Sequence, residues 1–366
     1  MKIISLFNNK GGVGKSTLAF HLGFALKEIG YKTLLVDLDP QCNLTICGID
    51  EERLHRIWKS EDPFIDDFET AQRDSSDFSN IIESPRSIHF LLKPTEDGIS
   101  DFDGLPPLLE LDSNLDLLPG RLSIHKYENK IAERWSGAYQ GDNLSIRTIT
   151  NIRNICQLYS KQNNYDYIIV DTSPSLGILN KTIISTVDGF FVPAQPDMFS
   201  LYGIRNIGSS LSLWQKEFKT IYGLISEEKR KRFPEKFVQF LGYTIYNARP
   251  YAGLNEYNLS QAHYDYVKQI PKTIESFINP ENREHLTDEM LKAPIGESAV
   301  MHTHNTYPSM SQKYNTPIWN VPTIALSTES DSKLRSSISG NRESYLATKR
   351  KYISFAKSLI QRISAL

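Results

Sequence analysis

The chain has 366 residues, of which 40% are hydrophobic and 23% are charged, and its formal net charge at pH 7 is −2. This composition is typical of a soluble globular protein with a full core, and it excludes an overall basic character, so any nucleic-acid contact must come from a local cluster of cations. Three cysteines without a CxxC pair, no long uncharged apolar stretch and no secretory leader predict a cytoplasmic protein with reduced thiols.

A glycine-rich loop follows the first predicted strand, residues 3–7, and precedes a predicted helix over residues 18–29. Its glycines let backbone N–H groups turn towards one point, where the helix adds its positive dipole end, so the loop predicts a phosphate site. We expect Lys15 to reach the β- and γ-phosphates, Ser16 to ligate Mg²⁺ and Thr17 to contact the α-phosphate. The residues expected to bind nucleotide here are Lys10, Gly11, Gly12, Val13, Gly14, Lys15, Ser16 and Thr17.

Two further predicted strands end in carboxylates. Residues 33–38 lead to Asp37 and Asp39, and residues 167–170 lead to Asp171. In an open α/β sheet the carboxyl ends of the strands face the ligand, so these side chains are expected near the phosphate loop. Strand-end carboxylates that follow such a loop indicate a metal and water site more than simple turns.

The loop KGGVGKST has an early lysine, Lys10, and resembles the deviant Walker A loop of the ParA/MinD ATPases, which segregate plasmids and chromosomes or position cargo. The segment DLDPQxN, from Asp37 to Asn43, resembles the family's switch I, and DTSPS from Asp171 resembles its switch II. The likeness is nearest to the ParA/Soj partition ATPases. It implies one doubly wound α/β domain over residues 1–366, with a mostly parallel sheet and helices on both faces.

The resemblance also assigns roles in Mg²⁺-dependent ATP hydrolysis. Lys10, Lys15 and Asp39 would be catalytic: Lys10 would reach across a nucleotide-sandwich homodimer to the partner subunit's phosphates, and Asp39 would position the attacking water. Ser16, Asp37 and Asp171 would hold Mg²⁺. Cys42 departs from the family pattern, which usually has glycine at that position.

Two segments, about 50–86 and 251–316, find no counterpart in the resemblance and are expected as insertions on the rim. The first is acidic and predicts a solvated loop with a short helix or two, although an interaction element stays open. The second contains helical fragments and the pair His302 and His304, which we expect to be surface histidines because no further ligand lies at metal-binding spacing.

Between the two insertions, predicted strands and helices alternate along the chain. Strands are predicted at 115–119 and 189–193, a helix at 146–159, and a second helix that begins after Ser200 as its N-cap. After residue 316, the segment PIWNVP (317–322) resembles the family's last strand.

Base and DNA contacts follow only from the resemblance. It implies adenine contacts from Asn247 and from Pro322. It also implies that a cation cluster before the strand at 240–246 binds duplex DNA without sequence preference, although a solvated turn is the alternative. The candidate DNA-binding residues are Lys229, Arg230, Lys231, Arg232 and Arg249.

The last predicted helix, residues 342–363, is amphipathic and is expected to pack on the sheet rather than bind a membrane. The leading hypothesis is a ParA-type switch: a slow ATPase that dimerises with ATP, binds DNA on the nucleoid and is discharged by a partner protein. A MinD-like membrane switch and the ATPase subunit of a mobile-element or defence system remain alternatives. Cluster-based electron transfer is disfavoured because no cysteine follows DTSPS.

Overall fold

A computed structural model describes residues 1–75, 78–101, 103–248, 255–297, 301–302 and 306–366. Its strands are β1 (Lys2–Leu6), β2 (Thr33–Asp37), β3 (Leu109–Asp112), β4 (Leu115–Leu118), β5 (Tyr167–Asp171), β6 (Gly189–Ala194), β7 (Gln239–Ala248) and β8 (Met301–His302). They form one sheet in the order β3-β4-β2-β5-β1-β6-β7-β8. Among the described strands only β3 pairs antiparallel, with β4, so the predicted mostly parallel sheet is confirmed.

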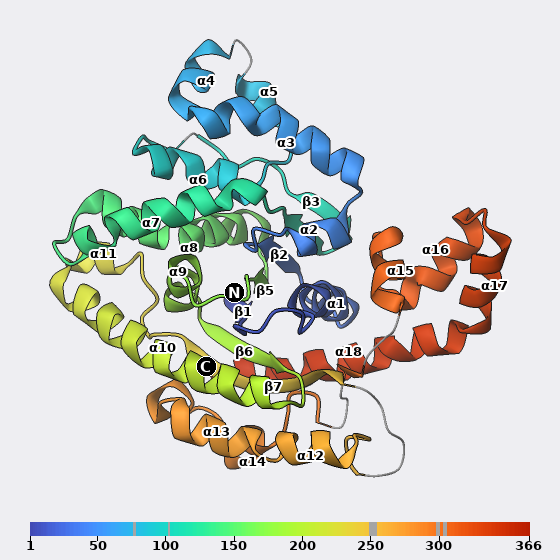
Figure 1. The fold of residues 1–366 in the computed structure, drawn as a ribbon. Coiled ribbons are helices and arrows are strands. Elements are labelled where there is room, and N and C mark those ends of the chain that lie inside the picture. The colour runs from blue at the N-terminus through green and yellow to red at the C-terminus, as the bar shows by residue number, and fades with distance from the viewer. Residues whose placement is uncertain (76–77, 102, 249–254, 298–300, 303–305) are drawn as a thin grey trace.

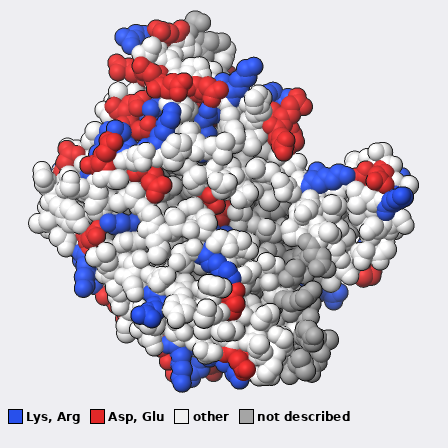
Figure 2. Space-filling view, in the orientation of Figure 1, with Lys and Arg blue, Asp and Glu red and all other residues white. Residues whose placement is uncertain are grey.

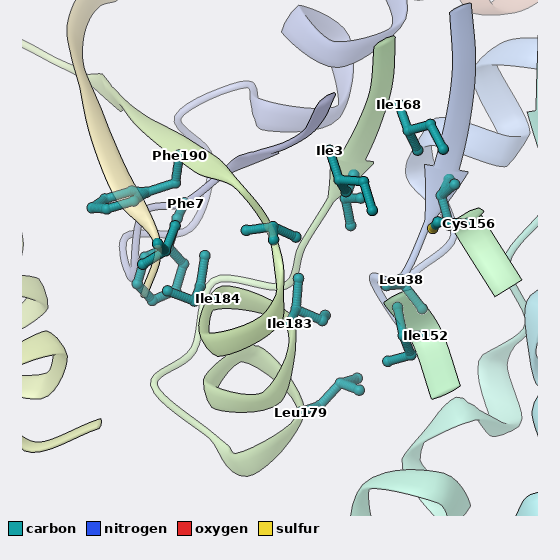
Figure 3. Packing of buried hydrophobic residues seen from close by; sticks show 14 of the residues in the cluster. Ile3, Phe7, Leu38, Ile152, Cys156, Ile168, Leu179, Ile183, Ile184 and Phe190 are labelled. Carbon is teal, nitrogen blue, oxygen red and sulfur yellow. The ribbon is translucent and has the colours of Figure 1, made fainter. Parts of the chain in front are cut away.

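Helices cover both faces of this sheet, as predicted (Figure 1). One face carries α7 (His125–Ala138), α8 (Asn143–Asn163), α9 (Ile178–Thr186) and α10 (Met198–Leu224), and the other carries α1 (Lys15–Glu28) and α18 (Arg342–Ile363). Because successive strand residues point to opposite faces, Leu34 and Val36 enter the first core while Leu35 enters the second. Figure 3 shows Ile3 and Ile168 of the strands packed with Ile183 of α9 in the first core.

The segment predicted as an acidic loop is helical instead. It forms α3 (Glu51–Asp66), α4 (Phe68–Asp74) and α5 (Phe78–Ile82), which lie at the top of Figure 1. Helices α3 and α4 pack on α6 (Ile88–Asp97), and Phe78 of α5 contacts Phe64 and Phe68. Phe64 and Phe68 are buried against Phe90 of α6. The prediction was wrong because it weighed the acidic content, whereas the apolar side chains at helical spacing find a partner surface on α6.

The second predicted insertion contains short helices, as expected. They are α12 (Gln261–Val267), α13 (Ile270–Phe277), α14 (Asp288–Lys292) and α15 (Tyr307–Lys313). Helix α13 packs on α10, and β8 extends the sheet beside β7. His304 lies outside the described residues, and in the part of the chain that is described no group of three potential metal ligands occurs.

Two local predictions were wrong. Residues 317–322 form a short 3₁₀ turn leading into α16 (Val321–Thr328), not a strand, because β8 already occupies the edge beside β7 and Pro322 favours a first helical turn. Helix α10 is capped by Asp197, whose carboxylate accepts a hydrogen bond from the N–H of Ser200, so Ser200 is not the cap. Helix α17 (Ser332–Gly340) then connects α16 to α18.

The terminal helix α18 has the predicted bounds and packs on α1. Its buried face contains Tyr352, Phe355 and Leu359, whereas Ile353 and Ile360 are only half-buried. Arg362 is buried as well and donates hydrogen bonds to the carbonyls of Leu241 and Ala293. No helix of the described residues is both long and apolar enough to cross a membrane.

Candidate nucleotide and metal site

The glycine-rich loop connects β1 to α1 and is fixed by hydrogen bonds of Asn8. The side-chain amide of Asn8 donates to the carbonyl of Pro193 (2.6 Å) and its oxygen accepts from the N–H of Lys10 (2.9 Å), which ties the loop to the end of β6. Helix α1 begins after Gly14 without any side-chain cap, so its first N–H groups remain available to an anion. The geometry therefore suits a phosphate, as the sequence predicted.

Gly14 shows why this position needs glycine. Its φ is +79°, and a Cβ there would lie 2.3 Å from the Cε1 atom of Tyr246 in β7. The Tyr246 hydroxyl in turn hydrogen-bonds that of Tyr352 in α18 (3.0 Å). The phosphate loop is thus packed against β7, and Tyr246 of that strand connects it to the terminal helix α18.

Three predicted metal residues meet at the carboxyl ends of β2 and β5. Asp37 and Asp171 are register partners in the two neighbouring strands, and both are fully buried. Burial raises the pKa of Asp171, and the neighbouring Asp37 raises it further. The Ser16 hydroxyl lies close enough to favour the ionised form of Asp171, yet neither carboxylate oxygen has a hydrogen-bond partner of full geometry among the described residues.

Asp37 is better provided with donors. Its Oδ2 accepts hydrogen bonds from the backbone N–H (2.8 Å) and the hydroxyl (2.7 Å) of Thr45, although burial still raises its pKa. Two adjacent buried carboxylates are costly unless cations balance both charges, and the single positive charge of Lys15 beside Asp171 balances only one of them. The residues Ser16, Asp37 and Asp171 therefore fit Mg²⁺, which prefers such oxygen ligands and water.

Lys15 lies in the same place. Its side chain is buried and its ammonium donates to the carbonyl of Asn8 at 3.3 Å. Burial lowers the pKa of Lys15, whereas Asp171 and Asp39 oppose that shift. This desolvated cation at the start of α1 is placed to bind phosphate.

Switch I follows β2 in a tight turn. Asp39 is almost fully buried, and its Oδ1 accepts the N–H of Gln41 (2.9 Å). Cys42, which precedes α2 (Asn43–Gly48), has a left-handed backbone with φ of 54°. A glycine would adopt this conformation without the cost of about 1 kcal/mol that a Cβ brings, which explains the family's usual residue there.

Switch II is held by a residue that the sequence reasoning missed. Asn180 of α9 donates from its amide nitrogen to the carbonyls of Ser173 and Ser175, both at 2.8 Å. The asparagine carries no local motif, and only the tertiary structure brings it under the DTSPS segment.

Lys10 does not point into the loop of its own chain. Its ammonium donates to the side-chain oxygen of Gln195 (2.6 Å) and pairs with Asp197, and it lies 5.8 Å from the ring centroid of Phe199. Gln195 and Asp197 come just before α10, whose first turns expose three large apolar residues. These are Met198, Phe199 and Tyr202.

The cleft at the loop has a volume of about 260 Å³. Neither Asn247 nor Pro322 is among the described residues that line it, so the two predicted adenine contacts stay predictions. The structure adds Gln312 of α15 and Cys47 of α2, neither of which belongs to a recognised motif, whereas Asn43 is the last residue of the switch I motif. The lining residues are Gly12, Val13, Gly14, Lys15, Ser16, Thr17, Asp39, Gln41, Asn43, Cys47, Pro174 and Gln312.

The AAA domain family matches residues 1–94 and 107–222, which is more than half of the 366 residues. The chain belongs to this family. The matched ranges include residues 50–86, whereas residues 251–316 lie outside the match, and the expectation that both segments are insertions stays a prediction.

Named relatives place this AAA-domain protein in the ParA/MinD type. It is 29% identical over 220 residues to the sporulation initiation inhibitor protein Soj of Bacillus subtilis, covering 60% of this chain and 68% of Soj. It is 25% identical over 212 residues to the chromosome partitioning protein ParA of Caulobacter vibrioides, covering 57% of this chain and 61% of that protein. It is 30% identical over 205 residues to a protein of Methanocaldococcus jannaschii, covering 56% of this chain and 63% of that protein. The matches therefore span about two thirds of these relatives.

Solved structures show the same fold over nearly the whole chain. The ParA of pNOB8 superposes with a TM-score of 0.57 at 19% identity, covering 99% of this chain and 98% of that one. The same ParA bound to nonspecific DNA gives 0.51 at 17% identity, covering 99% and 98%. McdA of Cyanothece in complex with ATP gives 0.56 at 16% identity, covering 98% and 96%. The ParA-like P-loop fold of this AAA-domain protein is thus established.

The predicted DNA-binding cluster lies far from the phosphate loop. It includes α11 (Glu227–Arg230), which follows the carboxyl end of α10, whereas Lys10 contacts the amino end of that helix, and 27 residues of helix span about 40 Å. Lys229 donates to the carbonyl of Gly141 (2.6 Å) and Arg230 to that of Tyr222 (2.8 Å). Lys231 and Arg232 are exposed, and Arg249 lies outside the described residues.

On the face seen in Figure 2, Lys and Arg side chains are dispersed among acidic ones. Lys231 itself pairs with Glu228 (2.6 Å). Two of the four described candidates, Lys229 and Arg230, therefore donate to carbonyls of their own chain. The other two, Lys231 and Arg232, are exposed and are the candidates for contact with a polyanion.

Proposed function

We propose that this protein is a Mg²⁺-dependent ATPase that dimerises with ATP and acts as a ParA-type switch in partition or cargo positioning. One observation carries the proposal: uncapped N–H groups and the buried cation Lys15 lie at one cleft, and the donor-poor carboxylate Asp171 lies next to Lys15 and Ser16. Phosphoryl transfer needs a cradled nucleotide, neutralised charge and a water held in line. Mg²⁺, when bound, supplies part of that neutralisation.

The residues divide the work. The loop amides and Lys15 bind the β- and γ-phosphates, and Ser16, Asp37 and Asp171 hold the metal directly or through water. Asp39 accepts a hydrogen bond from the attacking water and places it opposite the leaving oxygen. Hydrolysis is expected to be slow in a single chain because the cation of Lys10 is held outside the cleft by Asp197.

The proposed dimer brings the missing cation. In it, Lys10 leaves Asp197 and contacts the γ-phosphate in the partner subunit, while the exposed Met198, Phe199 and Tyr202 beside it are covered. A partner protein that stimulates hydrolysis then resets the switch. That McdA of Cyanothece was solved with ATP supports ATP as the nucleotide.

Replacing Lys10 by alanine should leave the protein monomeric with ATP, because a charge-assisted contact across the interface is lost. We expect at least a tenfold rise in the protein concentration needed for dimerisation, measured by light scattering with ATP and Mg²⁺. Lys27→Ala is the matched control, since Lys27 makes a similarly half-buried ion pair with Asp112. A Lys10→Ala protein that dimerises like the wild type would eliminate the sandwich dimer.

DNA binding by the ATP dimer is part of the proposal and is supported by the fold neighbour solved on nonspecific DNA. Lys231 and Arg232 are the candidates that remain exposed. The double variant Lys231→Gln, Arg232→Gln should reduce the slope of log affinity against log salt by about 2 per chain, because each lost phosphate contact removes roughly 0.9. Binding to a random duplex at several salt concentrations with ATP measures this slope.

The control for that experiment is Lys268→Gln, which removes an exposed cation that pairs with Asp265 of α12, an i,i+3 pair like that of Lys231 with Glu228. An unchanged slope in the Lys231, Arg232 variant would place the DNA contact elsewhere. The membrane alternative has less support, because it requires the apolar face of α18, and that face is buried against α1.

A further inference from the structure

Thr45, which has no role in the proposal so far, is hydrogen-bonded to the carboxylate of Asp37. It is fully buried, and both its N–H and its hydroxyl donate to Asp37 Oδ2. The Thr45 oxygen also accepts a hydrogen bond from the backbone N–H of Gly120 (2.8 Å). Since Gly120 occupies an acceptor position of the hydroxyl, the single hydroxyl proton is committed to Asp37.

Gly120 is in turn tightly fitted. A Cβ at this position would lie 3.1 Å from Cγ and from the carbonyl oxygen of Asp37, and 3.1 Å from Sγ of Cys42. The turn at Gly120 therefore backs onto switch I directly as well as through Thr45. There is thus no room for a side chain between this turn and the carboxylate of Asp37.

Helix α3 holds the turn from the other side. The indole N–H of Trp58 donates to the carbonyl of Gly120 (3.0 Å), and Arg121 donates to the carbonyl of Trp58 (2.8 Å). Arg121 also pairs with Glu61 (3.1 Å), which is fully buried and accepts two further hydrogen bonds from Ser87. Glu61 and Arg121 are buried and Trp58 is half-buried, and close-packed, hydrogen-bonded groups of this kind transmit a displacement.

We propose that Thr45 is a positioning residue for the metal carboxylate Asp37, and that α3, through Trp58 and the Gly120 turn, sets the position of Thr45. The inference rests on the proposed metal site. It gives the helical segment 50–86 a function: an orientation of α3 that keeps the Trp58 contact favours Mg²⁺ binding, and one that breaks it weakens Mg²⁺ binding. Residues that orient a ligand from behind typically contribute 10- to 100-fold in metal affinity.

The test measures metal binding without turnover, by titrating ADP-loaded protein with Mn²⁺ and following free Mn²⁺ by electron paramagnetic resonance. Thr45→Val, which removes the hydroxyl but keeps the shape, should weaken Mn²⁺ binding about 10-fold. Thr45→Ser, which keeps the hydroxyl, should retain near-wild-type affinity. Thr150→Val is the matched control, because the Thr150 hydroxyl is also buried but bonds only the carbonyl of Ile146.

The α3 link is tested separately with Trp58→Phe, which removes one hydrogen bond and should weaken Mn²⁺ binding about 3-fold even if Thr45→Val does not fold. Trp135→Phe is its control, since that indole N–H donates to Glu217 (3.0 Å) away from the site. Wild-type affinity in Thr45→Val, or equal losses in Thr45→Val and Thr45→Ser, would overturn the role of Thr45. Wild-type affinity in Trp58→Phe would overturn the role of α3.

A wrong assignment of the metal site would give a different result from a wrong assignment of Thr45. If Asp171→Asn binds Mn²⁺ as tightly as the wild type, the cleft does not hold the metal and the proposed function is wrong. If Asp171→Asn loses Mn²⁺ while Thr45→Val does not, only the positioning inference is wrong.

Discussion

Replacing Lys15 by alanine should weaken ATP binding at least 100-fold, which corresponds to about 2.7 kcal/mol. The reason is that Lys15 is a buried cation aimed at the phosphate position, and a charge-assisted hydrogen bond in a desolvated site has no substitute from water. Isothermal titration of the purified protein with ATP and Mg²⁺ measures the loss.

The fold itself should survive that change. Among the described residues the side chain of Lys15 donates one long hydrogen bond, to the carbonyl of Asn8 at 3.3 Å, so the melting temperature without nucleotide should change little. Unchanged ATP affinity in a folded Lys15→Ala protein would show that the glycine-rich loop is not the nucleotide site.

Replacing Asp39 by alanine should slow ATP hydrolysis about 100-fold while leaving ATP binding intact, because the residue is proposed to hold only the attacking water. Its carboxylate accepts the N–H of Gln41 and lines the cleft beside the loop. With hydrolysis blocked, the protein should accumulate as an ATP-bound dimer. Phosphate release and light scattering on the same sample measure both effects.

Asp101→Ala is a suitable control, because Asp101 is an exposed carboxylate that pairs with Arg147 outside the cleft. A wild-type rate of phosphate release in Asp39→Ala would remove the residue from the mechanism. Loss of nucleotide affinity in the same variant would instead assign Asp39 to binding.

The elements that were predicted well are those whose pattern is local. The strands ending at Asp37 and Asp171 are short apolar runs that are buried on both faces, and the helix over 342–363 has a clear amphipathic period, so each is determined by its own residues. The acidic content of residues 50–86 misled the prediction, because the partner surface for Phe64 and Phe68 is supplied by α6 and cannot be read from the segment alone.

The last predicted strand failed for a similar reason. Residues 317–322 were assigned to the sheet from the resemblance, yet the place beside β7 is taken by β8, and Pro322 lies in the first turn of α16. Competition between two segments for one sheet edge is settled by the whole chain. A motif match in either segment does not contain that information.

By itself the sequence determined the phosphate loop, the strand-end carboxylates and the ParA/MinD type, because glycine spacing and strand-terminal acids are properties of contiguous residues. Only the tertiary structure decided that Lys10 pairs with Asp197 and that Asn180 donates a hydrogen bond to switch II. It also decided that Thr45 donates to Asp37 and accepts a hydrogen bond from Gly120. These contacts join residues that are 7 to 187 positions apart. A hydrogen bond depends on distance and direction in space, and those are set by how the sheet and its helices pack.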